Sequence, residues 1–326
     1  MKKLFLSLVA AIVAATATYA QSTLVATLTH GETIKMYTGS NALFNAHNAA
    51  VSGDIINLSG GTFNATTITK GITIRGTGID EPHPTVLSSS NFWINIPEDD
   101  PNPFSMEGVR YYNIGNYSDG VVLYNAKNPT FIKCQINKFS SSSSSNFENA
   151  TFINCKIDQI TGVSSCSANF INCFIRSGEV GFKSSFVNCI LRSSSYSYGK
   201  AQFINCIIEG TTTINSSNKG FNCVQVASSE KNIFTSTGTF VDCSTTTYST
   251  LFKDYTGTYS DDQTFELTDE AKTTFLGADG TQVGLYGGML PYNSTPSYPR
   301  ITKFDVAKKA TADGKLSVDI EVSAAQ

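Results

Sequence analysis

A four-residue phrase returns seven times between Phe131 and Cys243, and the fold prediction rests on it. A full copy reads Phe, then Ile or Val, then usually Asn, then Cys, and the copy at residues 221–223 is looser. The copies end at Cys134, Cys155, Cys173, Cys189, Cys206, Cys223 and Cys243, which are 16 to 21 residues apart. A repeat of this length, rich in β-branched and aromatic residues, is too short for a propeller blade or a helix pair. It predicts a solenoid with one rung per copy.

Side chains alternate along a strand, so Phe, Cys and the apolar residue two positions after Cys are expected to point inward. Asn tolerates left-handed backbone angles, so a one-residue bend is expected at this position of each phrase. In stacked rungs the Asn side chains would form a column, and we expect amide hydrogen bonds from rung to rung. This column consists of Asn154, Asn172, Asn188 and Asn205, with Lys133 before it and Asp242 after it.

An antiparallel sandwich of unconnected strands is the alternative fold. It is disfavoured because one phrase recurs at a nearly constant interval without a hairpin signal such as Asn-Gly between copies.

The phrase, its spacing and the segments 53–63 and 68–78 resemble right-handed parallel β-helix proteins of the pectate-lyase-like fold. The resemblance is strongest to exported bacterial members whose rungs carry Phe-x-Asn-Cys. It implies an all-β, right-handed parallel β-helix whose first rung is covered by a helix. It does not indicate one activity, because this fold carries lyases, hydrolases, adhesins and proteins without catalysis.

The chain divides into four expected segments. Residues 1–20 have the basic start, short apolar core and small final residues of a signal peptide, which predicts an exported protein that is extracellular, periplasmic or at the cell surface. Residues 21–53 contain an alternating strand segment and an apolar pattern with helical spacing from Asn41, which predicts the capping helix. Residues 54–290 are assigned to the β-helix. Residues 291–326 are a linker and a hairpin that turns at Asp313-Gly314.

Composition limits the partners and the cysteine chemistry. The formal net charge is −3 and only 15% of residues are charged, so we expect no nucleic-acid partner, and no membrane span once the signal peptide is removed. Seven of the eight cysteines fall in one column, where parallel side chains suit disulfide geometry poorly. We therefore expect free, buried thiols that act as small core side chains. Cys166 lies outside the column, and its redox state is open.

Two groups of charged residues are candidates for a site. Glu98, Asp99 and Asp100 lie in a proline-rich loop and could hold Ca²⁺ through carboxylate oxygens, although solvated loop carboxylates are the simpler interpretation and no cofactor is required. Three residues after successive cysteines, one outward column contains Asp158, Arg176, Arg192 and Glu209. These four are candidate catalytic residues of a surface site. The favoured interpretation is a charge ladder in which each arginine neighbours one acid.

A further outward column is apolar. It consists of Ile132, Ile153, Ile171, Val187, Ile204 and Val241, and we call it the outer stripe. A stripe of this length is normally covered or used, so we expect a terminal segment, a turn or a partner chain to pack on it.

The sequence favours a non-catalytic secreted or cell-surface scaffold that is adhesive or binds a glycan. A polysaccharide lyase or glycoside hydrolase of the pectate-lyase-like fold is the enzymatic alternative, and a passive structural surface protein is the third. The expected partner is a polysaccharide or another protein.

Overall fold

The structure is a computed structural model. It describes residues 24–80, 82–88, 92–111, 120–161, 167–178, 184–192, 200–209, 218–226, 240–255, 257–260, 262–306, 309, 311, 313–315 and 317–323. The expected signal peptide and Cys166 lie outside these residues.

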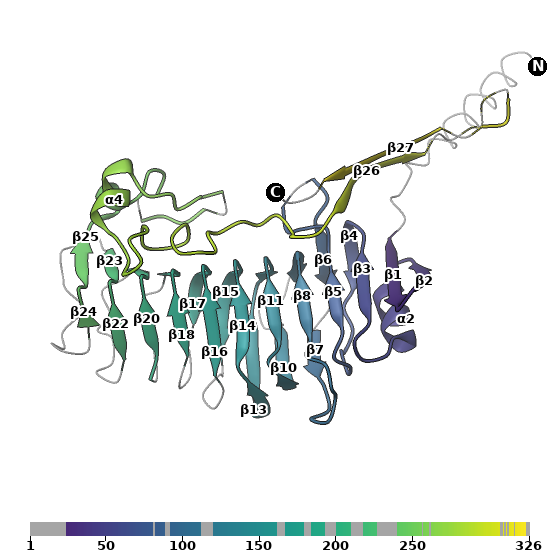
Figure 1. The fold of residues 1–326 in the computed structure, drawn as a ribbon, viewed down its shortest axis with the longest axis horizontal. Coiled ribbons are helices and arrows are strands. Elements are labelled where there is room, and N and C mark those ends of the chain that lie inside the picture. Colours follow the sequence, from purple (N-terminus) through teal and green to yellow (C-terminus); the bar gives the residue numbers. More distant parts are fainter. Residues whose placement is uncertain are drawn as a thin grey trace, which may run out of the picture.

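The described chain is a parallel β-solenoid built from two long sheets, as the repeat predicts (Figure 1). Sheet A has twelve strands, and from β3 onward each pairs in parallel with the next. In spatial order they are β2 (Thr33–Thr38), β1 (Val25–His30), β3 (Ile55–Leu58), β5 (Thr73–Arg75), β8 (Ser105–Glu107), β11 (Thr130–Ile132), β14 (Ala150–Ile153), β16 (Ala168–Ile171), β18 (Ser185–Val187), β20 (Gln202–Ile204), β22 (Lys219–Phe221) and β24 (Phe240–Val241).

Sheet B has thirteen strands and forms the second wall. Its main path is β4 (Gly61–Asn64), β6 (Thr85–Ser88), β9 (Val109–Tyr111), β12 (Gln135–Ile136), β15 (Lys156–Thr161), β17 (Phe174–Gly178), β19 (Ile190–Arg192), β21 (Ile207–Glu209), β23 (Val224–Val226) and β25 (Ser244–Thr246). Three further strands lie off this path: β7 (Phe92–Asn95), β10 (Val121–Lys127) and β13 (Phe139–Glu148).

The bend between the two sheets lies at the third residue of each phrase, as predicted. Lys133, Asn154, Asn172, Asn188, Asn205, Asn222 and Asp242 all have left-handed φ angles between 49° and 54°. Asn is among the few residues that adopt this conformation at low cost. One repeated residue choice therefore turns the chain from sheet A to sheet B in every rung.

Identical side chains stack inside the barrel. The rings of Phe131, Phe152, Phe170, Phe186 and Phe203 lie nearly parallel, with neighbouring centroids 4.8 to 5.1 Å apart, close to the spacing between strands. The described cysteines form a second column of free thiols, buried except at the partly exposed Cys243, which confirms the prediction. Burial raises the pKa of the Cys134 and Cys155 thiols well above the ordinary range.

The copy of the repeat at residues 221–223 departs from the pattern because Gly220 stands where the other copies have phenylalanine. Gly220 occupies the position that Phe203 fills one rung earlier, so Phe221 aligns with Ile204 and faces outward. A Cβ on Gly220 would overlap the Phe240 ring, which fills the space of the missing phenylalanine. Phe221 therefore extends the outer stripe and is 40% exposed.

The first rung is covered as expected. Strands β1 and β2 form an antiparallel hairpin, and β1 pairs antiparallel with β3. Helix α2 (Ala42–Ala49) packs on these strands and buries Leu43 and His47. The Asn41 side chain does not cap the helix. It accepts a hydrogen bond from Asn64 instead. The described residues contain no helix long and apolar enough to cross a membrane.

After β25 the chain leaves the two sheets and runs back along them (Figure 1). Residues 247–275, here called the cap, contain α3 (Tyr248–Leu251) and α4 (Asp269–Thr274). Residues 276–298, here called the strap, run back toward the N-terminal rungs. Strands β26 (Arg300–Val306) and β27 (Val318–Ser323) form the expected antiparallel hairpin, which extends away from the solenoid.

Candidate functional site

The cap packs on the outward face of sheet B. In four neighbouring strands the residue directly after the cysteine is apolar and faces outward: Phe174, Ile190, Ile207 and Val224. These side chains are buried in one cluster with Leu251, Phe252, Tyr255 and Phe265 of the cap. This second apolar column was not predicted from the sequence. The same counting that placed the charged column two residues further on could have found it.

The strap packs on the Asn bends. The Asn172 side-chain amide donates to the carbonyl oxygens of Leu285 (2.7 Å) and Gly287 (2.8 Å). The Asn154 amide reaches the carbonyl oxygen of Pro291 (3.4 Å). The expected rung-to-rung amide ladder is therefore wrong: the amide oxygens of Asn154, Asn172 and Asn188 receive no hydrogen bond from the described residues. At Asn154 and Asn172 the strap backbone accepts the amide hydrogens that the neighbouring amide oxygen would have received.

Both ends of the strap are anchored. At one end, Gly284 has a φ of +80°, and a Cβ there would lie 2.5 Å from the Ile207 side chain, so the close contact with sheet B favours glycine. At the other end, the Glu107 carboxylate accepts hydrogen bonds from the backbone and hydroxyl groups of Ser297 (2.7 and 2.6 Å). The Tyr298 hydroxyl donates to the carbonyl oxygen of Gly76 (2.5 Å).

A cavity of about 320 Å³ lies where the cap, the strap and sheet B meet. Aromatic rings form much of its wall: Phe174, Tyr259, Phe265, Tyr286 and Tyr292. Leu285 and five polar or charged residues complete the wall: Asp80, Lys156, Asp262, Gln263 and Thr264. Ligand cavities commonly combine such apolar walls with a few polar groups.

Two residues of the cavity have features that packing alone does not require. Phe265 has a left-handed φ of 57°, although it is a bulky residue, and its ring stacks on Phe174 at a centroid distance of 4.7 Å. Strained backbone of this kind persists where the surrounding structure fixes it and is concentrated at functional sites. The Tyr292 hydroxyl is buried, and no described residue forms a hydrogen bond with it. A bound polar group would satisfy this hydroxyl.

The charged column lies beside this cavity and forms two pairs. The Arg176 Nε atom lies 3.8 Å from a carboxylate oxygen of Asp158, and the Arg192 Nε atom lies 3.5 Å from Glu209. Each arginine therefore neighbours one acid, as the ladder interpretation predicts. Both guanidinium groups also face the Tyr259 ring, at 5.6 and 5.0 Å from its centroid.

Three of the four side chains in this column are partly exposed, including Arg192 at 25%. The Glu209 side chain, in contrast, is 3% exposed beneath the cap. The expectation of one surface site is therefore wrong at Glu209. The position faces away from the barrel, as counted, but the cap covers it.

Burial dominates the electrostatics of Glu209. It raises the pKa of this carboxyl to about 7, against the opposing effects of Tyr255, Arg192 and Tyr248. The Tyr255 hydroxyl donates to Oε2 (2.7 Å) and accepts from Arg192 Nε (2.8 Å). Oε1 receives no hydrogen bond from the described residues. A pKa near 7 would suit a general acid, but Glu209 does not line the cavity.

The candidate metal residues do not converge. Asp100 accepts hydrogen bonds from the Ser52 hydroxyl and from the backbone amides of Asn102 (3.0 Å) and Gly71 (3.1 Å), which lower its pKa against the effect of burial. It therefore stabilises the loop. Within the described residues, no group of three His, Cys, Asp or Glu side chains is arranged to hold a metal ion.

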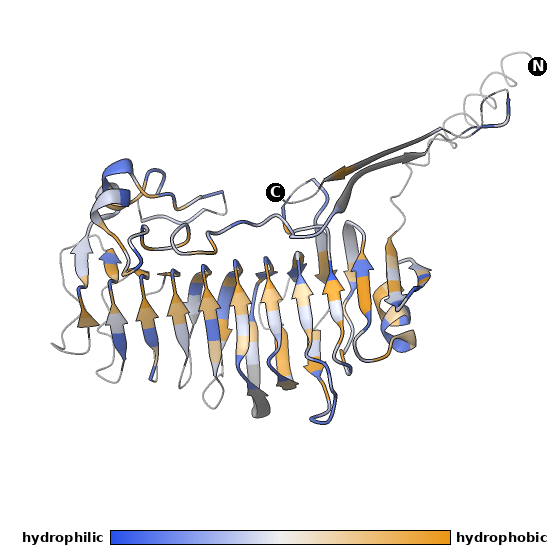
Figure 2. Ribbon diagram, viewed as in Figure 1, coloured by the Kyte–Doolittle hydropathy of each residue, from blue (hydrophilic) through white to orange (hydrophobic). Residues whose placement is uncertain are grey.

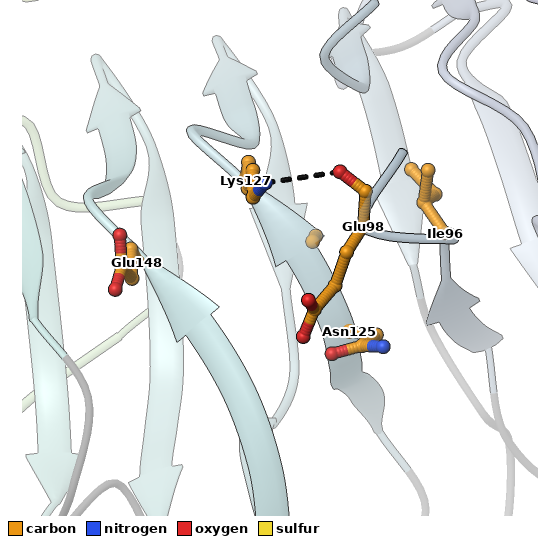
Figure 3. Close-up of a pocket in the computed structure, with 6 residues that line it drawn as sticks. Ile96, Glu98, Asn125, Lys127 and Glu148 are labelled. Atoms are coloured by element: carbon orange, nitrogen blue, oxygen red, sulfur yellow. Dashed lines mark hydrogen bonds between the residues drawn. The ribbon is translucent and has the colours of Figure 1, made fainter. Parts of the chain in front are cut away.

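Glu98 lines a smaller cavity of about 160 Å³, together with residues of β10 and β13 (Figure 3). The Lys127 ammonium donates to the Glu98 carbonyl oxygen (2.9 Å), and Glu148 and Asn125 complete the polar lining. Asp99 does not line this cavity.

Comparisons with known proteins add no relative to this description. No family model matches the chain, and neither a curated protein nor a solved structure is significantly similar to it.

Proposed function

We propose that this protein is a non-catalytic exported scaffold of the pectate-lyase-like kind that binds a glycan in the cavity beneath the cap. The observation that carries the proposal is the aromatic wall of that cavity beside polar groups. Aromatic faces pack on apolar surface, and hydroxyl, amide and charged groups can bond to sugar hydroxyls. The volume of about 320 Å³ is at the lower end for ligand cavities, which suits a short glycan segment or a chain end.

Lys156 is the polar group with the strongest claim to a ligand contact. It lies on β15 beside Phe174 of β17, at the cavity wall. The arginines of the neighbouring column are already paired with Asp158 and Glu209. Lys156 therefore offers a donor from the rigid sheet, while the cap and strap provide the rings.

The test is a glycan array followed by calorimetric titration of the glycans that bind. Tyr259→Ala removes one ring of the wall and Lys156→Gln removes the ammonium group. We expect each variant to lower the affinity about tenfold or more, since a lost charged hydrogen bond or ring contact costs on the order of 1 to 2 kcal/mol. Tyr124→Ala and Lys127→Gln are matched controls outside the cavity. Equal affinities for all four variants, or no binding across the array, would contradict the proposal.

An enzyme is the second candidate, and the pKa of Glu209 near 7 is the observation that favours it. A lyase or hydrolase would require the Glu209 carboxyl, which is buried beneath the cap, to reach the substrate, so the cap would have to open. Turnover of a polysaccharide panel with and without Ca²⁺ separates the candidates. Activity that disappears in Arg176→Ala or Arg192→Ala, but not in Lys127→Gln, would establish an enzyme.

A further inference from the structure

Three polar side chains form a cluster between the cap and sheet B, two of them from the sheet and one from the cap. Glu209 comes from β21, Arg192 from β19, and Tyr255 from the cap. Tyr255 joins the other two, because its hydroxyl donates to Glu209 and accepts from Arg192. Around this group the cap is held by apolar contacts with Ile190, Ile207 and Val224.

The Glu209 carboxylate is incompletely compensated in this arrangement. One oxygen has the Tyr255 donor and the nearby Arg192, whereas Oε1 is buried without a hydrogen-bond donor among the described residues. An unpaired buried anion costs more than an unpaired buried neutral group. On β23 the neighbouring residue is Val226, which brings no charge, and from the cap the Tyr248 hydroxyl also faces Glu209.

We infer that Glu209, Tyr255 and Arg192 form a pH-sensitive latch that holds the cap closed while Glu209 is protonated and loosens it when Glu209 ionises. The latch regulates the cavity, because Tyr259 and Phe265 of the cap form part of the cavity wall. This consequence for ligand binding rests on the proposed function. The movement of the cap itself does not.

The direction follows from the protonation of the closed and open states. Burial places the pKa of Glu209 at about 7 in the closed state, against an ordinary value of 4.5 once the cap opens. Between these values the closed state binds the additional proton, so the closed state loses stability as the pH rises through this range. The pKa of Tyr255 is raised, mainly by burial and then by Glu209, so its hydroxyl remains a donor throughout.

Hydrogen exchange on the full chain tests the latch without any ligand. Cap amides that bond within the cap, such as those of Phe252, Thr268 and Lys272, report its opening. The amide of Thr151 on sheet A, which bonds to the carbonyl oxygen of Pro129, is the internal reference. After correction for intrinsic exchange, we expect cap protection to fall roughly thirtyfold between pH 5.5 and pH 8.5, while the reference stays constant.

Three variants make the test specific. Glu209→Gln should abolish the pH dependence, whereas Glu270→Gln, an equal change at an exposed position on α4, should retain it. Tyr255→Phe removes the donor to the carboxylate and should move the midpoint to higher pH, which keeps the test decisive if Glu209→Gln does not fold. Equal cap protection at both pH values, or an unchanged pH dependence in Glu209→Gln, would overturn the latch.

Titration of a glycan at both pH values then separates the two proposals. If the affinity falls with pH in the unmodified protein and not in Glu209→Gln, the latch regulates the cavity. If no glycan binds while cap protection still depends on Glu209, the glycan proposal fails and the latch stands. If glycan binds equally at both pH values while the cap opens, regulation of the cavity is excluded.

Discussion

The two outward faces of the solenoid come from the same rungs, yet the described part of the chain covers only one of them. On sheet A, hydrophobic colour recurs at corresponding positions from strand to strand (Figure 2), and the residues of the outer stripe lie in register along these strands. Its members are half-buried, and Val241 is 41% exposed. On sheet B, the column from Phe174 to Val224 lies beneath the cap.

The difference teaches that an apolar column in a repeat does not by itself identify the covered face. The expected terminal segment exists, but it packs on sheet B and on the Asn bends, and the stripe residues belong to neither described hydrophobic cluster. The cap supplies large apolar side chains, such as Phe252 and Phe265, that fill the space over sheet B. Which face of the solenoid is covered is therefore determined by the cap and the strap, which lie outside the repeat.

The largest difference in stability loss between the two faces is expected from lysine substitutions within one rung. Ile190→Lys would bury an unpaired ammonium beneath the cap, which we expect to cost about 4 kcal/mol and to expose the cap to proteolysis. Val187→Lys, three residues earlier on the open face, should cost less than about 1 kcal/mol. Limited proteolysis and chemical denaturation measure both. Equal tolerance would show that the cap contributes little to the folded state.

A smaller contrast is expected from removing side-chain volume in the next rung. Ile207→Ala leaves a cavity between sheet B and the strap and should cost about 3 kcal/mol. Ile204→Ala, which is half-buried on sheet A, should cost about 1 kcal/mol, because it leaves no enclosed space. The ratio of the two losses in chemical denaturation measures the effect of coverage. Similar losses would mean that a partner or a second copy buries the open face.

The charged column provides a third contrast at the edge of the cap. Arg192→Ala removes the cation beside buried Glu209 and should cost about 2 kcal/mol above pH 7, where the carboxyl ionises. Arg176→Ala removes a partly exposed partner and should cost less than about 1 kcal/mol. Denaturation at pH 8 in low and high salt compares them. A larger loss of stability in Arg176→Ala than in Arg192→Ala would contradict the inference that the cap covers the Arg192 pair and leaves the Arg176 pair exposed.

The smallest expected difference separates two contributions of the Asn residues to stability: their hydrogen bonds to the strap and their left-handed bend. Asn172→Ala loses both the left-handed preference and two hydrogen bonds to the strap. Asn222→Ala has the same φ requirement, and no described hydrogen bond joins its side chain to the strap. The additional loss in Asn172→Ala should be about 1 kcal/mol. Identical losses would show that only the bend matters.

Much of the solenoid could be predicted because it repeats. The inward Phe and Cys columns, the bend at Asn and the outward charged pairs all follow from counting along one strand. The helix over the first rung was also predicted, because Leu43 and Ala46 have helical spacing. The strand segment before it is a two-stranded hairpin, which the alternating pattern did not distinguish from a single strand.

The cap and cavity could not be predicted in this way. Tyr259, Phe265 and Tyr292 belong to segments without a period, so no count along a strand places them on Phe174. The roles of Glu209 and the Asn amides changed for the same reason, because both depend on which distant segment covers them. Asp100 became a loop-stabilising group because Ser52, far away in the sequence, provides a donor.

The strap also has a consequence for the order of assembly. Rungs can stack one on the next as the chain emerges, since each needs mainly its neighbour. The strap joins Tyr298 to Gly76, a separation of 222 residues, so it can close only after every intervening rung is in place. The bends of the early rungs therefore lack their strap contacts until residues 276–298 have been synthesised. Completion of this long loop converts a chain of locally coupled rungs into one cooperative body.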